Sequence, residues 1–155
     1  MESCCSAATE PTAGSVCPEC GERGRSVDRI TLKALLRPAG LMRLSPAEYR
    51  FCPTASCRVV YFALASLYHC EDLTVPVFQK EAAGNRTVCY CFDTTETDVR
   101  CEIQGSTSAA SARITALVKA GRCACEVRNP QGTCCLGNVN AVEASSVEVV
   151  PASAT

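Results

Sequence analysis

The sequence has no tryptophan, and only four phenylalanines and four tyrosines among its 155 residues. Aromatic anchors for a large hydrophobic core are therefore scarce, and small domains of this composition would be marginal on apolar burial alone. No stretch approaches the length of a membrane span, and the N-terminus has neither the basic start nor the apolar run of a secretion signal. We therefore expect a cytoplasmic protein without a membrane span.

Excess charge and hydrolytic motifs are also missing. The formal net charge is −1, which provides no basic surface for nucleic acid. The sequence contains no Gly-rich phosphate loop, no Ser/His/Asp set and no paired-carboxylate motif. Its one histidine, His69, is expected to be a surface or packing residue rather than a metal ligand. The sequence thus predicts a protein that is not an enzyme, apart from an open question of whether it reduces a bound metal ion.

Cysteine, by contrast, is abundant. Fourteen cysteines in 155 residues would suggest a disulfide scaffold in a short secreted chain. In a reducing compartment the same density more often indicates metal binding or redox chemistry. Because a secretion signal is not found, we favour the metal interpretation and keep the disulfide scaffold as the alternative.

Four cysteines in the N-terminal half form two knuckles. Cys17 and Cys20 have C-x₂-C spacing, and Cys52 and Cys57 have C-x₄-C spacing. Short runs of β-branched and aromatic residues on either side of the second knuckle predict strands there. Two such knuckles supply the four thiolates of a tetrahedral zinc site. The pattern predicts a zinc-ribbon-like domain that binds one Zn²⁺.

A second group of cysteines lies in the C-terminal half. Cys89 and Cys91 are one residue apart, and a thiol-rich stretch follows more than thirty residues later, with cysteines at Cys123, Cys125, Cys134 and Cys135. Four thiolates brought together from two such loops can hold a [2Fe–2S] cluster. A disulfide pair or simply buried thiols are the alternatives at this point.

Helical signals separate the two cysteine loops. Thr95-x-x-Asp98 matches a capping box, and Gly105 is expected to end the helix that it opens. A second helix is expected to begin at Ser108 or Ser111 and to end near Gly121. We expect these two helices to form a hairpin that brings the two cysteine loops together.

A third helical turn is expected in the second loop, with Asn129 as N-cap and Pro130 at the first helical position. Cys134 and Cys135 would then fall just inside it. The N-termini of this turn and of the Thr95 helix would face the anionic cluster.

The expected fold is α+β, with a small zinc-ribbon-like β domain followed by a small helical domain. The expected divisions are a disordered tail over 1–16, the zinc domain over 17–80, a linker over 81–87, the cluster domain over 88–142 and a tail over 143–155.

Two stretches together resemble a known family. Val88-Cys89-Tyr90-Cys91-Phe92 and residues 119–135 resemble the bacterioferritin-associated-ferredoxin-like (BFD-like) [2Fe–2S] domain of CopZ-type metallochaperones. Residues 51–62, with Cys17 and Cys20, resemble the zinc domain that precedes it in the same proteins. The resemblance covers roughly residues 17–140, and both halves match in the right order.

The resemblance implies a ligand set for each metal. Zinc would be bound by Cys17, Cys20, Cys52 and Cys57. The cluster would be bound by Cys89, Cys91, Cys125 and Cys135, with Cys123 and Cys134 as the thiols that could replace an assigned ligand.

The resemblance also implies a role in copper or mercury handling, as a metallochaperone or an electron-transfer accessory with a redox or metal-transfer partner protein. The copper chaperones of this family carry a further heavy-metal-associated domain with an M-x-C-x-x-C loop, which we expect this chain, ending at Thr155, to lack. Cys4 and Cys5 are adjacent thiols that could capture a soft ion such as Hg(II) or Cu(I). The alternative is a zinc-only structural or interaction module with two Cys₄ sites.

Overall fold

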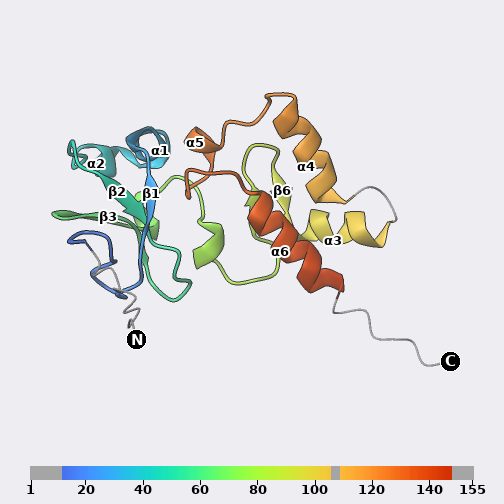
Figure 1. The fold of residues 1–155 in the computed structure, drawn as a ribbon, viewed down its shortest axis with the longest axis horizontal. Coiled ribbons are helices and arrows are strands. Elements are labelled where there is room, and N and C mark those ends of the chain that lie inside the picture. The colour runs from blue at the N-terminus through green and yellow to red at the C-terminus, as the bar shows by residue number, and fades with distance from the viewer. Residues whose placement is uncertain (1–11, 106–108, 148–155) are drawn as a thin grey trace, which may run out of the picture.

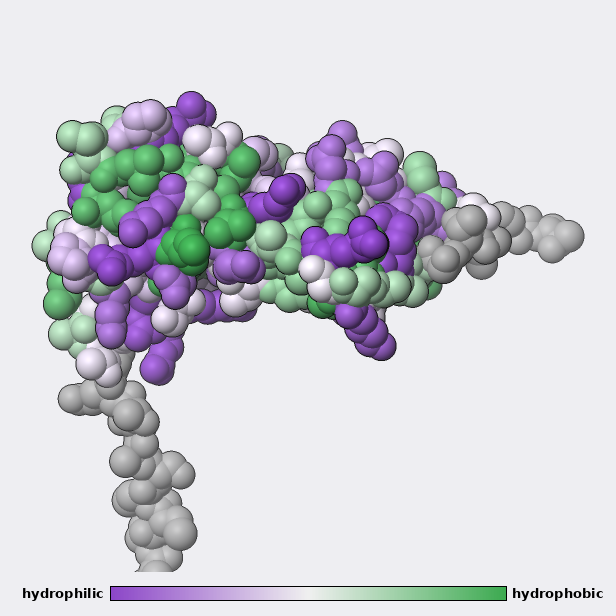
Figure 2. Space-filling view, turned by 90° about the horizontal axis from the view of Figure 1, so that it is seen from above, coloured by the Kyte–Doolittle hydropathy of each residue, from purple (hydrophilic) through white to green (hydrophobic). Residues whose placement is uncertain are grey.

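The computed structural model describes residues 12–105 and 109–147. A β-rich N-terminal half and a largely helical C-terminal half lie side by side (Figure 1). Figure 2 shows the two halves as lobes in direct contact. The structure therefore mixes sheet and helix as the sequence indicates. Within the described residues, no helix is long and apolar enough to cross a membrane.

The N-terminal half is built on an antiparallel sheet in the order β1-β2-β3-β4. Phe51 of β2 lies opposite Tyr61 of β3, and Phe62 of β3 lies opposite Leu67 of β4. Two short helices and two 3₁₀ turns complete this half. Its elements are β1 (Arg25–Val27), α1 (Arg29–Leu35), α2 (Pro38–Leu41), β2 (Tyr49–Phe51), β3 (Val59–Ala63), β4 (Ser66–His69), η1 (Cys70–Asp72) and η2 (Phe78–Lys80).

Strand β3 is buried on both faces, which explains its run of β-branched and aromatic residues. Val60 and Tyr61 belong to the main core with Tyr49, whereas Val59 and Phe62 pack among cysteines. Most of the few aromatic residues are used here, because Tyr49, Phe51, Tyr61, Phe62 and Tyr68 are all fully buried. The N-terminal half thus concentrates the aromatic anchors of the chain around one central strand.

The C-terminal half has a smaller, aliphatic core. Val99 on α3, Ile114 on α4 and Val139 on α6 pack together, and Cys89 and Cys135 belong to the same buried cluster. The elements are β5 (Thr87–Cys89), β6 (Thr94–Thr95), α3 (Glu96–Gln104), α4 (Ala110–Lys119), α5 (Cys125–Arg128) and α6 (Leu136–Val147). Two of the predicted cluster ligands are therefore core residues of this half.

The expected helix ends are partly confirmed. The Thr95 amide donates to Asp98 Oδ2 (2.8 Å), the Asp98 amide donates to Thr95 Oγ1 (3.2 Å), and Gly105 is the C-cap. Helix α4 begins after Ala109, so Ser111 is not its cap; the Ser111 amide and hydroxyl both donate to Glu143. Ser108 lies outside the described residues.

The prediction that a helical turn begins at Asn129 and Pro130 is wrong. Asn129 instead follows the last residue of α5, and its side-chain amide donates to the carbonyl of Thr133 (2.8 Å). This local hydrogen bond closes a turn in place of capping a helix. Cys134 and Cys135 consequently precede a helix, α6, rather than lying within one.

The expected division into domains remains a prediction, but two of its tails contain ordered elements. Val16 forms a bridge with Arg23, and Ser15 is buried. At the other end, α6 runs to Val147, so residues 143–147 are helical. Residues 1–11 and 148–155 lie outside the described structure.

Candidate metal centres

Four cysteines of the N-terminal half converge on one point. The sulfurs of Cys17, Cys20, Cys52 and Cys57, named here the N-terminal set, all lie within 4.8 Å of one another. Cys17 Sγ is 3.9 Å from Cys57 Sγ, and Cys20 Sγ is 3.6 Å from Cys52 Sγ. A tetrahedral Zn²⁺ with Zn–S bonds of about 2.3 Å requires sulfurs about 3.8 Å apart. The N-terminal set therefore fits a single zinc ion.

Backbone hydrogen bonds shape both knuckles. The Cys17 amide donates to the carbonyl of Glu22 (2.8 Å), and the Gly21 amide donates back to the carbonyl of Cys17 (2.8 Å). In the second knuckle the Cys57 amide donates to the carbonyl of Thr54 (3.2 Å). Each knuckle is thus a closed turn that presents two sulfurs to the same point.

The electrostatics of the N-terminal set favour a cation. Burial raises the pKa of Cys17, and it raises the pKa of Cys57 to about 12. At Cys20 burial acts in the same direction, but hydrogen bonds with Thr54 and with the backbone of Glu22 outweigh it and lower the pKa to about 7. Thiolates crowded into a buried site need a compensating positive charge, so metal binding would release protons.

Four cysteines of the C-terminal half also come together, but as two pairs. Cys91 Sγ lies 3.6 Å from Cys125 Sγ, and Cys89 and Cys135 are buried in one hydrophobic cluster. These four are named the C-terminal set. Across residues 12–105 and 109–147, only the N-terminal set has three or more ligand atoms that all lie within 4.8 Å of one another. The C-terminal set is therefore more open than a site for one tetrahedral ion.

Neighbouring groups act on the thiols of both pairs. The Ala124 amide donates to Cys91 Sγ (3.2 Å). The neighbouring Cys135 thiol lowers the pKa of Cys89 to about 6, with smaller contributions from backbone amides, and Cys89 raises the pKa of Cys135. Burial, and then the neighbouring Cys91, raises the pKa of Cys125 to about 12. The raised pKa values mean that Cys125 and Cys135 would need a metal ion beside them to ionise.

A buried ion pair holds the first cysteine loop of the C-terminal half. Glu96 is only 1 % exposed, and its carboxylate accepts hydrogen bonds from the Arg86 guanidinium (2.7 Å) and from the amides of Gly84 and Arg86. These contacts fix the chain just before strand β5, which carries Cys89. Sequence analysis missed this role, because Glu96 reads only as an acidic residue in the first turn of α3.

The remaining cysteines belong to neither set, although Cys123 and Cys134 interact electrostatically with Cys125. Cys123 is half-buried and Cys134 is exposed. Cys70 and Cys101 are half-buried and exposed, respectively. Cysteines of the described residues are all free thiols, and Cys4 and Cys5 lie outside those residues.

His69 behaves as expected. Its Nε2 is 2.9 Å from the carboxylate of Glu19. It is not part of the four-sulfur set that it flanks.

Comparison with known proteins agrees with the geometry of the N-terminal half. Residues 14–74 match a protein-family model described as a zinc binding domain of the CopZ type. This region is a CopZ-type zinc-binding domain. Its match encloses the whole N-terminal set.

Two further comparisons, both with CopZ of Archaeoglobus fulgidus, extend the match. The chain is 31% identical over 120 residues to the copper chaperone CopZ of Archaeoglobus fulgidus, an alignment that covers 77% of this chain and 57% of the relative. It thus spans little more than half the length of that chaperone. The crystal structure of the Archaeoglobus fulgidus CopZ N-terminal domain has a TM-score of 0.68 and 27% identity, covering 82% of this chain and 96% of that one. The chain is homologous to this N-terminal domain.

Proposed function

We propose that this chain is a cytoplasmic metallochaperone or electron-transfer accessory in heavy-metal handling. In this proposal the N-terminal set binds one Zn²⁺ and the C-terminal set binds a [2Fe–2S] cluster. The match to the CopZ-type zinc domain supports the first assignment. The likeness to the CopZ N-terminal domain covers 82% of this chain, which extends well beyond residues 14–74 and supports treating both halves together.

The observation that carries the cluster assignment is the paired arrangement of the C-terminal set. A [2Fe–2S] cluster held by four cysteines takes two thiolates at each iron, so its ligands fall into two close pairs. Cys91 and Cys125 form one such pair, and Cys89 and Cys135, buried in one hydrophobic cluster, form the other, from loops that are distant in sequence. The residues present therefore fit the group.

The protein contributes more than ligands. The Ala124 amide on Cys91 is a hydrogen bond of the kind that tunes the reduction potential of such centres. Half-burial of Cys91 and burial of Cys89, Cys125 and Cys135 limit access of water. The all-thiolate set favours a low potential over the raised potential of His-ligated centres.

When bound, the cluster would supply one electron at a time. Reduction of Cu(II) to Cu(I) takes one electron, and thiolates prefer Cu(I). Reduction of Hg(II) to the metal takes two electrons, so copper suits the proposed centre better as a redox substrate. The copper ion would be held by a partner protein or by Cys4 and Cys5.

The test is metal content and spectroscopy of protein purified anaerobically with iron supplied. We expect equal amounts of iron and sulfide, one zinc ion per chain, no EPR signal as isolated, and a spin-one-half signal after dithionite. Cys91→Ala should abolish iron binding, whereas the matched variant Cys134→Ala should retain it. Zinc in both sets with no iron would instead establish the zinc-only interaction module.

A further inference from the structure

One 3₁₀ turn touches the loops of both candidate centres. Lys80, the last residue of η2, donates from Nζ to the carbonyl of Thr54 (2.6 Å). Thr54 lies inside the Cys52–Cys57 knuckle, and its hydroxyl is 3.4 Å from Cys20 Sγ. The Lys80 ammonium therefore binds the Cys52–Cys57 knuckle at Thr54, between its two cysteines.

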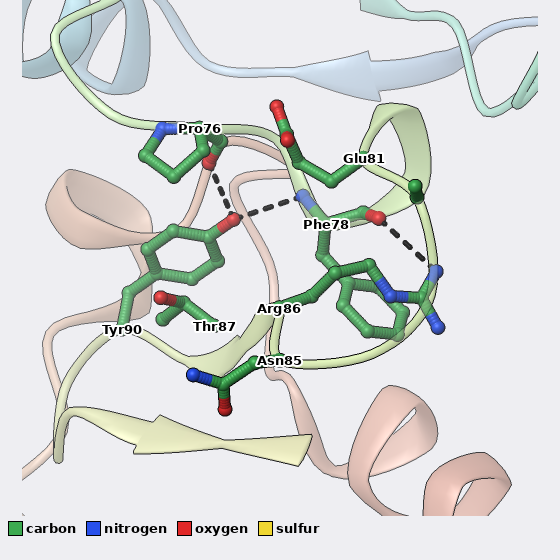
Figure 3. A pocket seen from close by; sticks show the side chains of 8 residues that line it. Pro76, Phe78, Glu81, Asn85, Arg86, Thr87 and Tyr90 are labelled. Atoms are coloured by element: carbon green, nitrogen blue, oxygen red, sulfur yellow. Dashed lines mark hydrogen bonds between the residues drawn. The ribbon is translucent and has the colours of Figure 1, made fainter. Parts of the chain in front are cut away.

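The two preceding residues contact the cysteine loops of the C-terminal half. Gln79 Nε2 donates to Gln131 Oε1 (2.6 Å), and Gln131 Nε2 donates to the carbonyl of Cys134 (3.0 Å). The Phe78 amide donates to the hydroxyl of Tyr90 (3.0 Å), the residue between Cys89 and Cys91 (Figure 3). Three consecutive residues thus join the zinc knuckle to both loops of the C-terminal set.

A second connection runs from the sheet and α1 to α5 and the loop that follows it. Tyr61 on β3 donates its hydroxyl to the carbonyl of Pro130 (2.6 Å), and Thr31 on α1 donates its hydroxyl to the carbonyl of Glu126 (2.6 Å). Both side chains are fully buried. Figure 1 shows α5 beside α1. Unpaired carbonyls buried at this interface would be costly, so these bonds fix the loop against the zinc domain.

We propose that the zinc site positions the C-terminal set, with Lys80 as the positioning residue that links them. Zinc orders the Cys52–Cys57 knuckle, and the Thr54 carbonyl of this knuckle accepts the hydrogen bond from Lys80. The turn η2, which ends at Lys80, in turn holds the two cysteine loops of the C-terminal half through Gln131 and Tyr90. The inference rests on the proposed function only in naming the cluster as the occupant of the C-terminal set. Coupling of this kind is reciprocal, so filling the C-terminal set tightens zinc binding by the same factor.

The first test uses iron-free protein with zinc bound. The alkylation rate of each cysteine by iodoacetamide is measured by mass spectrometry, with exposed Cys101 as the internal reference. Lys80→Met should raise the rates at Cys91 and Cys125 on the order of tenfold, because it removes a hydrogen bond from a charged donor. Lys80→Arg should restore the slow rates. Arg58→Met is the matched control, since the Arg58 pair with Glu71 is exposed and lies within the N-terminal half.

Zinc removal then separates coupling from simple destabilisation. In the native chain, chelation of zinc should raise the same alkylation rates on the order of tenfold. In Lys80→Met chelation should raise the rates by a clearly smaller factor, because the Lys80 link is already broken and only the Tyr61 and Thr31 contacts remain to be lost. A merely structural Lys80 would leave the two effects additive, and that result would overturn the proposal.

The loaded protein supplies an independent measurement. Lys80→Met should speed iron release and shift the reduction potential while zinc content stays unchanged, and Arg58→Met should do neither. If the chain takes up no iron, the proposed function fails, but the alkylation assay still decides the coupling. If iron binds and zinc removal leaves the alkylation rates unchanged, the coupling fails and the cluster assignment stands.

Discussion

Gly132 offers a direct test of how closely the loop after α5 approaches the zinc domain. Its φ is +70°, and a Cβ built there would lie 2.9 Å from Val27 Cγ2 and 3.1 Å from Thr31 Oγ1. Gly132→Ala therefore combines two costs. The left-handed backbone costs about 1 kcal/mol for alanine, and the overpacked contact adds about 1–3 kcal/mol.

Gly121 is the matched control. Its φ is +69°, but a Cβ there would meet nothing within 4 Å. Gly121→Ala should therefore lose only the backbone contribution, about 1 kcal/mol. In thermal unfolding of the zinc-loaded protein, that loss corresponds to a fall in Tm of about 2–4 °C. The Tm of Gly132→Ala should fall at least twice as far.

The comparison removes the shared backbone term, so the difference between the variants measures the contact with Val27 and Thr31. Displacing the Thr31 side chain would also disturb its hydrogen bond to the Glu126 carbonyl, which acts in the same direction. Equal losses in the two variants would refute the close approach of the loop to α1 and would remove one support of the interface between the halves.

Two further predictions concern stability. Cys52→Ser should release zinc and unfold the N-terminal half, because zinc can supply on the order of 10 kcal/mol to small sites; retained stoichiometric zinc and native circular dichroism would contradict the assignment. The hydrogen bonds from Arg86 lower the pKa of Glu96 to about 2 from its ordinary 4.5, so this carboxylate stabilises the fold above pH 4.5 and loses that effect as the pH falls toward 2. Glu96→Gln should cost up to about 3 kcal/mol at pH 7 in urea unfolding, and its difference from the native chain should vanish near pH 2.

The N-terminal half could largely be predicted from its sequence, because its signals are local. The β-branched and aromatic run over 58–62 predicts a strand there, and β3 spans Val59–Ala63, one residue later at each end. The prediction from local sequence that Thr31 caps a helix over residues 32–36 is wrong at its start. Asp28 caps α1 by accepting the amide of Ile30, whereas Thr31 donates to the Glu126 carbonyl of the other half. A contact across 95 residues decided the boundary.

The cysteine loop of the C-terminal half illustrates the same limit. Asn129 followed by Pro130 is a good local start for a helix, yet the carbonyl of Pro130 accepts from the buried Tyr61 hydroxyl. The Asn129 side chain meanwhile closes the turn to Thr133. The family resemblance implied which cysteines of this loop belong to the C-terminal set, whereas the partners that shape the loop come from the zinc domain and have no local signature.

The distribution of buried side chains explains why a metal centre suits the C-terminal half. Its core is aliphatic and small, and Cys89 and Cys135, 0% and 2% exposed, are members of that core. Cys91 is half-buried, and exposed Cys134 lies next in sequence to Cys135. A metal centre bound by the C-terminal set would therefore complete the core through Cys89 and Cys135. Its path to solvent would be shorter on the side of Cys91. If the C-terminal set binds the proposed cluster, Cys89 and Cys135 would link cluster binding to folding, and the pair of Cys91 and Cys125 would be better placed to exchange an electron with a partner.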